Sequence, residues 1–201
     1  LHADSEPSLV RAWALWNLGS VNHLQGRKAM QGNDFDRAAV KLDEAERYYR
    51  EALRMQPGIP ALGLNQEMVL ADRQLNEKMK QVMEELARKL DRAREETRQA
   101  LADQQKVDGA ATDEARDSAL QQAQAQTQEA AQAARDVADF IDQLQAGQPE
   151  QKPNIGKAAA EELAQADAAQ EKAGYKVHTD AARDEKLAEA TVHLKNAAAM
   201  L

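Results

Sequence analysis

The chain has 201 residues, a net charge of −8 and 43% hydrophobic positions, enough to bury the core of one domain or of two small ones. An acidic surface repels phosphate backbones, and no basic stripe with interleaved aromatics occurs, which argues against nucleic-acid binding. No apolar run approaches the ~20 residues that cross a bilayer, so we expect no transmembrane segment.

The composition predicts an all-α fold. Only 3% of the residues are aromatic, and alanine, the best intrinsic helix former, dominates the second half. Five prolines and nine glycines leave room for long helices. The stretch 99–151 is rich in Ala and Gln and could be read as disordered low complexity, but its helical apolar spacing favours a long helical arm.

The first residues of the chain bear on the cellular compartment of the protein. Leu1-His2-Ala3 resembles the tail of a signal peptide, with Ala3 as the small residue before the cut. The chain has no cysteine, which excludes disulfides but leaves the compartment open. A periplasmic or envelope-associated location is one interpretation, and a cytoplasmic location is the alternative.

Two helices are expected before the first strong breaker. The first begins at Pro7-Ser8 and runs to about Gln31, and Gly32-Asn33-Asp34 forms a turn and a cap. The second runs from about 35 to 55 and ends at 56–60, which contains two prolines.

A long arm and a final helix pair follow. Residues 61–106 predict one helix, Asp108-Gly109 a turn, and Thr112 the cap of a second long helix. Asn154 caps a helix to about Ala173, and a last helix follows a turn at 174–180. The apolar seams are Leu75, Met79, Val82, Leu86, Leu90, Ala93, Thr97 and Ala100, then Ala119, Ala123, Ala130, Ala134, Val137, Ile141 and Leu144, and finally Leu187, Ala190, Leu194, Ala197 and Leu201. Because two short helices are marginal alone, the last pair is expected to dock on the arm or on the first hairpin rather than form a separate lobe.

The first third resembles a tetratricopeptide (TPR) repeat. The matching signals, in order, are Asn17-Leu18-Gly19, Gly32-Asn33-Asp34-Phe35-Asp36-Arg37-Ala38, Tyr48-Tyr49-Arg50-Glu51-Ala52-Leu53 and Pro57. Each helix has about seven residues too many, which is close to two helical turns and returns the same face to the same side. The resemblance implies one elongated TPR hairpin over 9–57, and the alternative is an ordinary helical hairpin that ends in a proline.

The TPR resemblance also implies a groove that binds a peptide or a helix. Asn65 then takes the same repeat position as Asn17, where an amide can bridge the backbone of an extended peptide. The expected partner-binding residues are Trp13, Trp16, Asn17, Ser20, His23, Leu64, Asn65 and Met68, with Lys28 as a further neighbour. The alternative is that Trp13 and Trp16 are core residues, or that one is buried and the other half exposed.

Residues 65–71 (NQEMVLA) after the hairpin, followed by an Ala/Gln-rich helical tail, are similar to TPR members of bacterial Bat (aerotolerance-type) operons. Those operons encode MoxR-type ATPases and von Willebrand A-domain proteins. This resemblance implies a bacterial envelope adaptor.

No catalytic or metal-binding pattern is found. None of the four histidines has another at a spacing of three or four, so no helical metal pair exists, and no phosphate loop or nucleophile elbow occurs. No enzymatic activity, metal or cofactor is expected.

The sequence thus predicts an elongated TPR-like hairpin with the start of the long helix (1–74), an antiparallel coiled-coil arm (75–147) and a terminal helix pair (154–201). The expected function is a non-catalytic adaptor that binds a protein or peptide. The alternatives are a structural coiled-coil spacer and a self-associating scaffold, which would be a homo-oligomer.

Overall fold

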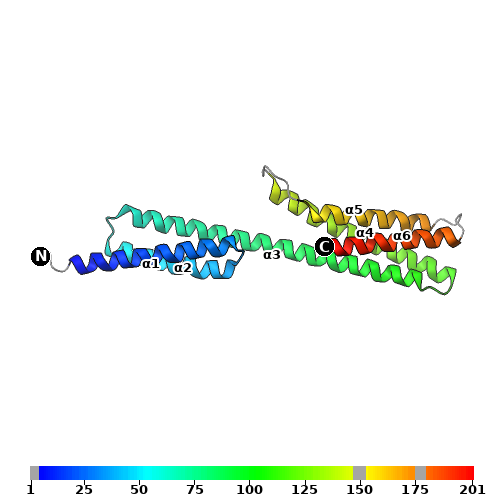
Figure 1. Ribbon diagram of the computed structural model, residues 1–201, viewed down its shortest axis with the longest axis horizontal. Helices are drawn as coiled ribbons and strands as arrows, with labels where there is room; N and C mark the ends of the chain where they lie inside the picture. The colour runs from blue at the N-terminus through cyan, green and yellow to red at the C-terminus, as the bar shows by residue number, and fades with distance from the viewer. Residues whose placement is uncertain (1–4, 147–152, 175–179) are drawn as a thin grey trace. The chain divides into compact units, whose positions relative to one another are not determined.

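The computed structural model describes residues 5–146, 153–174 and 180–201, with side chains from residue 8 onwards, and the regular structure in these ranges is all helical. The helices, labelled in Figure 1, are α1 Ser5–Gln31, α2 Phe35–Met55, α3 Pro60–Asp108, α4 Asp113–Gln145, α5 Ile155–Ala173 and α6 Asp180–Met200. The all-α prediction is confirmed, and the helix bounds agree with the expected ones within a few residues. The predicted leader remnant, most of the linker at 147–153 and most of the turn at 174–180 lie outside the described residues.

Short polar side chains set where several helices begin. Asp34, Thr112 and Asn154 each accept a hydrogen bond from the backbone N–H three residues later, at 3.2 to 3.3 Å. Such bonds satisfy N–H groups that have no partner within the helix. Between α1 and α2 the chain reverses through Asn33, whose φ of 59° lies in the left-handed region that asparagine tolerates.

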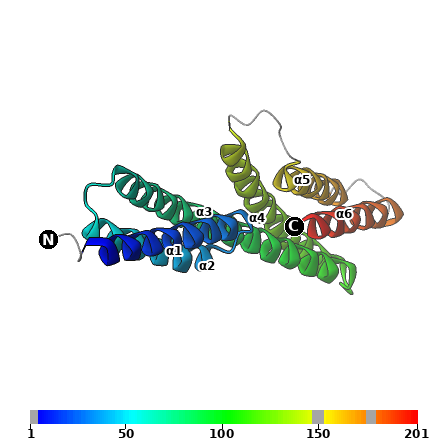
Figure 2. The same cartoon turned by 60° about the vertical axis from the view of Figure 1, so that its left-hand side comes forward.

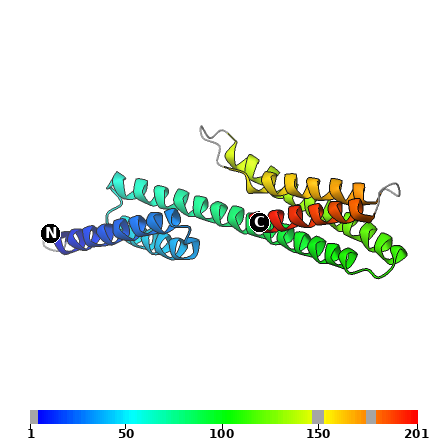
Figure 3. The same ribbon diagram turned by 45° about the vertical axis from the view of Figure 1, so that its right-hand side comes forward.

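The chain divides into two compact units, unit 1 (Leu1–Glu84) and unit 2 (Glu85–Leu201). In unit 1, α1, α2 and the first part of α3 lie side by side (Figure 2). In unit 2, the second part of α3 packs with α4, α5 and α6 (Figure 3). The three expected segments are therefore distributed over two units, and residues 154–201 share a unit with most of the arm.

Unit 1 is built around large side chains. Tyr49, Leu42 and Leu62 are at most 1% exposed in its core. Helix α1 has glycine where the first two of these side chains lie, because a Cβ on Gly19 would come within 2.7 Å of the Tyr49 ring and one on Gly26 within 2.8 Å of Leu42. The Leu-Gly of the TPR-like signal thus marks a real close approach between α1 and α2.

Polar contacts fix α3 against both helices of the hairpin. His23 of α1 lies 2.6 Å from a carboxylate oxygen of Asp72 in α3. Arg73 of α3 pairs with Asp43 of α2 at 2.8 Å and also with Glu46. Since Glu46 is only 6% exposed, its carboxylate depends on its two cationic partners, Arg73 of α3 and Arg50 of α2, to remain stable inside the unit.

Unit 2 is built mainly around alanine. Its main core contains Ala93, Ala100, Ala130, Ala131, Ala133, Ala134, Val137, Ala159, Leu163, Ala166, Leu194, Ala197 and Leu201, from all four helices. These small side chains allow the helix backbones to approach closely. A Cβ on Gly156 of α5 would come within 2.5 Å of the backbone nitrogen of Ala138 in α4, so this crossing leaves no room for a side chain.

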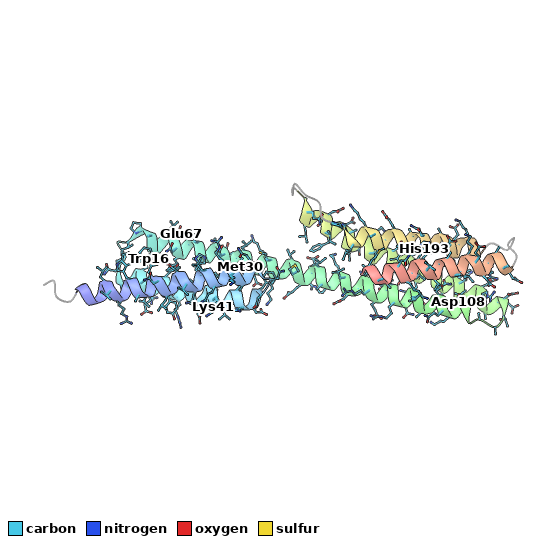
Figure 4. The ribbon with its side chains drawn as sticks, viewed as in Figure 1. Trp16, Met30, Lys41, Glu67, Asp108 and His193 are labelled. Atoms are coloured by element: carbon cyan, nitrogen blue, oxygen red, sulfur yellow. The ribbon has the colours of Figure 1, made fainter. Side chains whose placement is uncertain are left out.

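Polar side chains link the helices of unit 2. Gln170 of α5 is fully buried and donates from Nε2 to Oε1 of the equally buried Gln104 of α3, at 2.8 Å. His193 of α6, labelled in Figure 4, lies 2.8 Å from Glu162 of α5. These contacts join α5 to α3 and to α6, so the terminal helix pair is docked on the arm helices.

The predicted apolar seams differ in how far they are buried. The seam of the last helix is fully covered, with Leu187, Ala190, Leu194, Ala197 and Leu201 all buried. The seam of α3 is divided between the units. Ala93, Thr97 and Ala100 are buried in unit 2, whereas Met79 packs against the core of unit 1 and Leu75 is 48% exposed.

Candidate functional site

Unit 1 leaves a large apolar surface uncovered on α1. Twelve of the sixteen exposed large apolar side chains in the described residues lie in unit 1, although unit 2 is the longer. Six of the twelve belong to α1: Leu9, Val10, Trp13, Leu18, Val21 and Leu24. Single exposed apolar residues are ordinary, whereas a contiguous group of them is a candidate interaction surface.

Helix α1 has apolar residues on two opposite sides. The buried side includes Ala12, Gly19, His23, Gly26 and Met30, and Asn22 and Ala29 beside them are also buried. The outer seam, as we name the opposite side, consists of Val10, Trp13, Asn17, Val21 and Leu24. At 3.6 residues per turn the outer seam spans roughly 80° and is centred roughly 150° from the buried side. A helix that is apolar all round is normally buried all round, yet in the described part of the chain the outer seam is exposed.

Trp13 and Trp16 form a stacked pair on α1. Their ring centroids are 4.5 Å apart and their planes differ by 25°. Trp13 is 46% exposed, whereas Trp16, labelled in Figure 4, is half-buried and packs against the core of unit 1. Trp16 therefore holds the Trp13 ring in a fixed position at the surface, where a rigid aromatic is an effective anchor for a partner.

Helix α3 extends this apolar surface. Because α2 reverses the chain between them, α1 and α3 run in the same direction, and the His23–Asp72 contact sets their relative level. Both helices rise 1.5 Å per residue, so Leu64 and Met68 lie near the levels of residues 15 and 19 of α1. Leu64 is 58% and Met68 45% exposed, and Asn65 between them is half-buried.

Two predicted groove residues of α1 are engaged inside unit 1. The Tyr49 hydroxyl donates to the Ser20 hydroxyl at 3.0 Å, and burial raises the pKa of Tyr49, so this phenol stays protonated as a donor. His23 is 8% exposed and is held by Asp72. Asn17 and Lys28, in contrast, are exposed, and within the described residues the Asn17 amide has no hydrogen-bond partner.

The other two helix contacts of unit 1 have charged residues at the surface. The cleft between α2 and α3 is lined by Asp43, Arg73 and Glu77, and also by the apolar Ala39 and Leu70. On the α1–α2 side, Arg11 pairs with Glu51 at 3.1 Å. Apart from Val40 on α2, the exposed large apolar side chains described in unit 1 all lie on α1 and α3.

The described residues offer neither a metal site nor a membrane-spanning helix. They contain no group of three His, Asp or Glu side chains placed to hold a metal ion. No helix within them has the length and hydropathy to cross a membrane.

The sequence prediction missed part of this surface. Val10, Val21 and Leu24 of the outer seam were not among the expected partner-binding residues, although all three are 51–69% exposed. The available signal was that, between residues 12 and 26, α1 has no Asp, Glu, Lys or Arg on any side. Only the observed neighbours of α1 could show that α2 and α3 cover one side and leave the other open.

Comparison of the chain with protein-family models, curated proteins and solved structures found no match. The TPR resemblance rests on the residues quoted above and stays a prediction.

Proposed function

We propose that the protein is a non-catalytic interaction adaptor that binds a helix or a peptide through the outer seam of α1 and the adjoining edge of α3. One observation carries this proposal: α1, a helix of 27 residues, has four large apolar side chains on its outer seam that its own unit leaves 46–69% exposed. Covering apolar surface is worth about 25 cal/mol per Å² before the entropic cost of association, so each exposed apolar side chain that a partner covers adds to the affinity.

The spacing of the exposed residues favours a helical partner. Outer-seam positions follow one another at intervals of three or four residues, which is the pattern that packs against another helix. An extended peptide would instead depend on amides such as Asn17 and Asn65 to pair with its backbone. Asn17 is available for this, whereas Asn65 is half-buried.

The TPR resemblance supports the same function through the implied groove between α1 and α3. The similarity to TPR members of Bat-type operons further supports an envelope-associated or periplasmic location, with the cytoplasm as the alternative. Both belong to the proposal, as does the absence of enzymatic activity.

The alternative function is a structural spacer or scaffold. It is favoured by α3, which runs for 49 residues and contributes to both units. In that case the length of α3 matters, and substitutions on the outer seam are silent.

Affinity capture from the cells that make the protein separates these functions. The comparison uses the wild type, Val21→Glu on the outer seam, and Val40→Glu as a matched control on α2, because the two valines are 51% and 57% exposed. We expect a protein that the wild type and Val40→Glu retain and that Val21→Glu loses. Equal recovery by all three proteins would remove α1 from the binding surface and leave the spacer as the better function.

An Asn17→Ala/Asn65→Ala variant tests the form of the ligand. If the partner binds as an extended peptide, removal of both amides abolishes capture. If it binds as a helix against the apolar seam, capture persists.

A further inference from the structure

We propose that the partner of the outer seam is a second copy of this chain, with its α1 packed antiparallel about a two-fold axis at Asn17. This inference rests on the proposed function, since it names the occupant of the same surface. It is carried by the symmetry of the seam, by the chemistry of the residue at its centre and by its lack of charge.

The outer seam has the same spacing in both directions from Asn17. Trp13 and Val21 lie four residues away on either side, and Val10 and Leu24 lie seven residues away. Two such helices packed antiparallel therefore place Trp13 against Val21 of the second copy and Val10 against its Leu24. A two-fold interface requires this self-complementarity, in which residue i meets j and j meets i.

Asn17 suits a position on the axis. A carboxamide has two N–H donors and a carbonyl acceptor, so two copies of Asn17 can donate to and accept from each other. In the described residues of one chain this exposed amide has no partner. A single Asn at the centre of an apolar helix seam is also a known means of fixing register and orientation between helices.

The seam carries no charge that would repel a second copy. Between residues 12 and 26 the only ionisable side chain of α1 is His23, and it is buried on the opposite side against Asp72. Two copies of this face can therefore meet without burying an ion. Leu64 and Met68 of α3 lie level with residues on either side of Asn17, so they add apolar surface close to the axis.

The size of the seam predicts a reversible dimer. From Val10 to Leu24 it is about 21 Å long, at 1.5 Å per residue. A single pair of helices of this length falls below the ~1,200 Å² of buried surface that marks stable interfaces. Dimerisation is therefore expected to depend on protein concentration.

A unique thiol at the axis tests the geometry directly. The chain has no cysteine, so Asn17→Cys introduces the only one, and Val40→Cys on α2 is the matched control. Helices that pack 8–10 Å apart bring facing Cα atoms to roughly 5 Å, which is within disulfide range. We expect Asn17→Cys to form a covalent dimer under mild oxidation and Val40→Cys to remain mostly monomeric. Equal cross-linking of the two variants would overturn the proposed axis.

Charge pairs test the antiparallel orientation. Val10→Glu alone and Leu24→Lys alone each place a charge in the seam and should weaken dimerisation at least about tenfold. In the double variant the introduced glutamate of one copy faces the introduced lysine of the other, and sedimentation equilibrium should show restored dimerisation. A parallel arrangement would place like charges together, so a double variant weaker than either single one would overturn the orientation.

The oligomeric state and the affinity capture together distinguish this inference from the proposed function. A monomeric chain that still captures another protein, and loses it on Val21→Glu, would refute the second copy and keep the adaptor. A monomeric chain that captures nothing would refute both. Circular dichroism of each variant verifies that its helices remain folded.

Discussion

The two units build their hydrophobic cores from different side chains. Unit 1 packs three helical segments around Tyr49, Leu42 and Leu62, and it has twelve of the sixteen exposed large apolar side chains in the described residues. Unit 2 packs four helical segments around alanines and exposes four. The apolar content of a unit therefore does not by itself indicate a candidate interaction surface. Such a surface is indicated by apolar side chains that the unit's own helices leave uncovered.

The reason lies in the distribution of apolar residues around each helix. In α6, Leu187 and Leu194 lie on one seam with alanines between them, and that seam is buried. In α1, large apolar residues occur on both sides, but α2 and α3 cover only one. The excess on α1 is not covered within unit 1, and it is the basis of the proposed binding.

The largest effect is expected from truncating the core of unit 1. Leu42→Ala removes a fully buried side chain that packs over Gly26, and it should lower the free energy of unfolding by about 2–5 kcal/mol. Both tryptophans of the chain lie in unit 1, so denaturation followed by their emission reports on this unit. A loss below about 1 kcal/mol would contradict a tightly packed core here.

A smaller effect is expected from overfilling unit 2. Gly156→Ala places a methyl group against the backbone of Ala138 and should destabilise unit 2 by about 1–3 kcal/mol, despite the higher helix propensity of alanine. Hydrogen exchange of the α4 and α5 amides measures this change. Unchanged or stronger protection would show that the α4–α5 crossing is not closely packed.

Substitution of Asn17, the central residue of the outer seam, tests the comparison further. Asn17→Leu should lower the dissociation constant of the dimer by about tenfold, because it replaces a polar group in an apolar interface. Since Trp13 lies on the seam, dilution of the protein can be followed by tryptophan emission. Weaker association of this variant would argue that the Asn17 pair itself drives dimerisation.

The smallest effect concerns an ion pair on unit 2. The hydrogen bond from His193 holds the pKa of Glu162 below its ordinary value of 4.5, and Asn196 adds a second hydrogen bond. A carboxylate with a lowered pKa in the folded state stabilises the fold above pH 4.5, and this stabilisation disappears as the pH falls through the lowered pKa.

Glu162→Gln should therefore lose less stability than the wild type when the pH is lowered from 6 to 3. Thermal unfolding at several pH values measures the difference. Parallel pH profiles for the two proteins would show that the contact contributes nothing.

The sequence was sufficient to predict the helices because their ends are locally encoded. Gly32-Asn33-Asp34, Thr112 and Asn154 stop or cap helices through their own backbone and side-chain chemistry, and the structure has them in these roles. The seam of the last helix was also predictable, because a single apolar face has only one way to be buried.

Less of the candidate site could be predicted from the sequence. Ser20 and His23 were expected in the groove, but their partners Tyr49 and Asp72 come from other helices. The same limit applied to Val21 and Leu24, because their exposure depends on which sides of α1 the neighbouring helices cover. Such facts follow from tertiary packing and cannot be read from local spacing.

Sedimentation equilibrium of three proteins at increasing concentration tests the central claim most directly. Val21→Glu alters the outer seam, and Val192→Glu is a matched control in unit 2, because the two valines are 51% and 54% exposed. We predict that the average mass of the wild type and of Val192→Glu rises from 22.2 kDa towards twice that value, while Val21→Glu stays at 22.2 kDa. Equal behaviour of all three proteins would contradict dimerisation through the outer seam of α1.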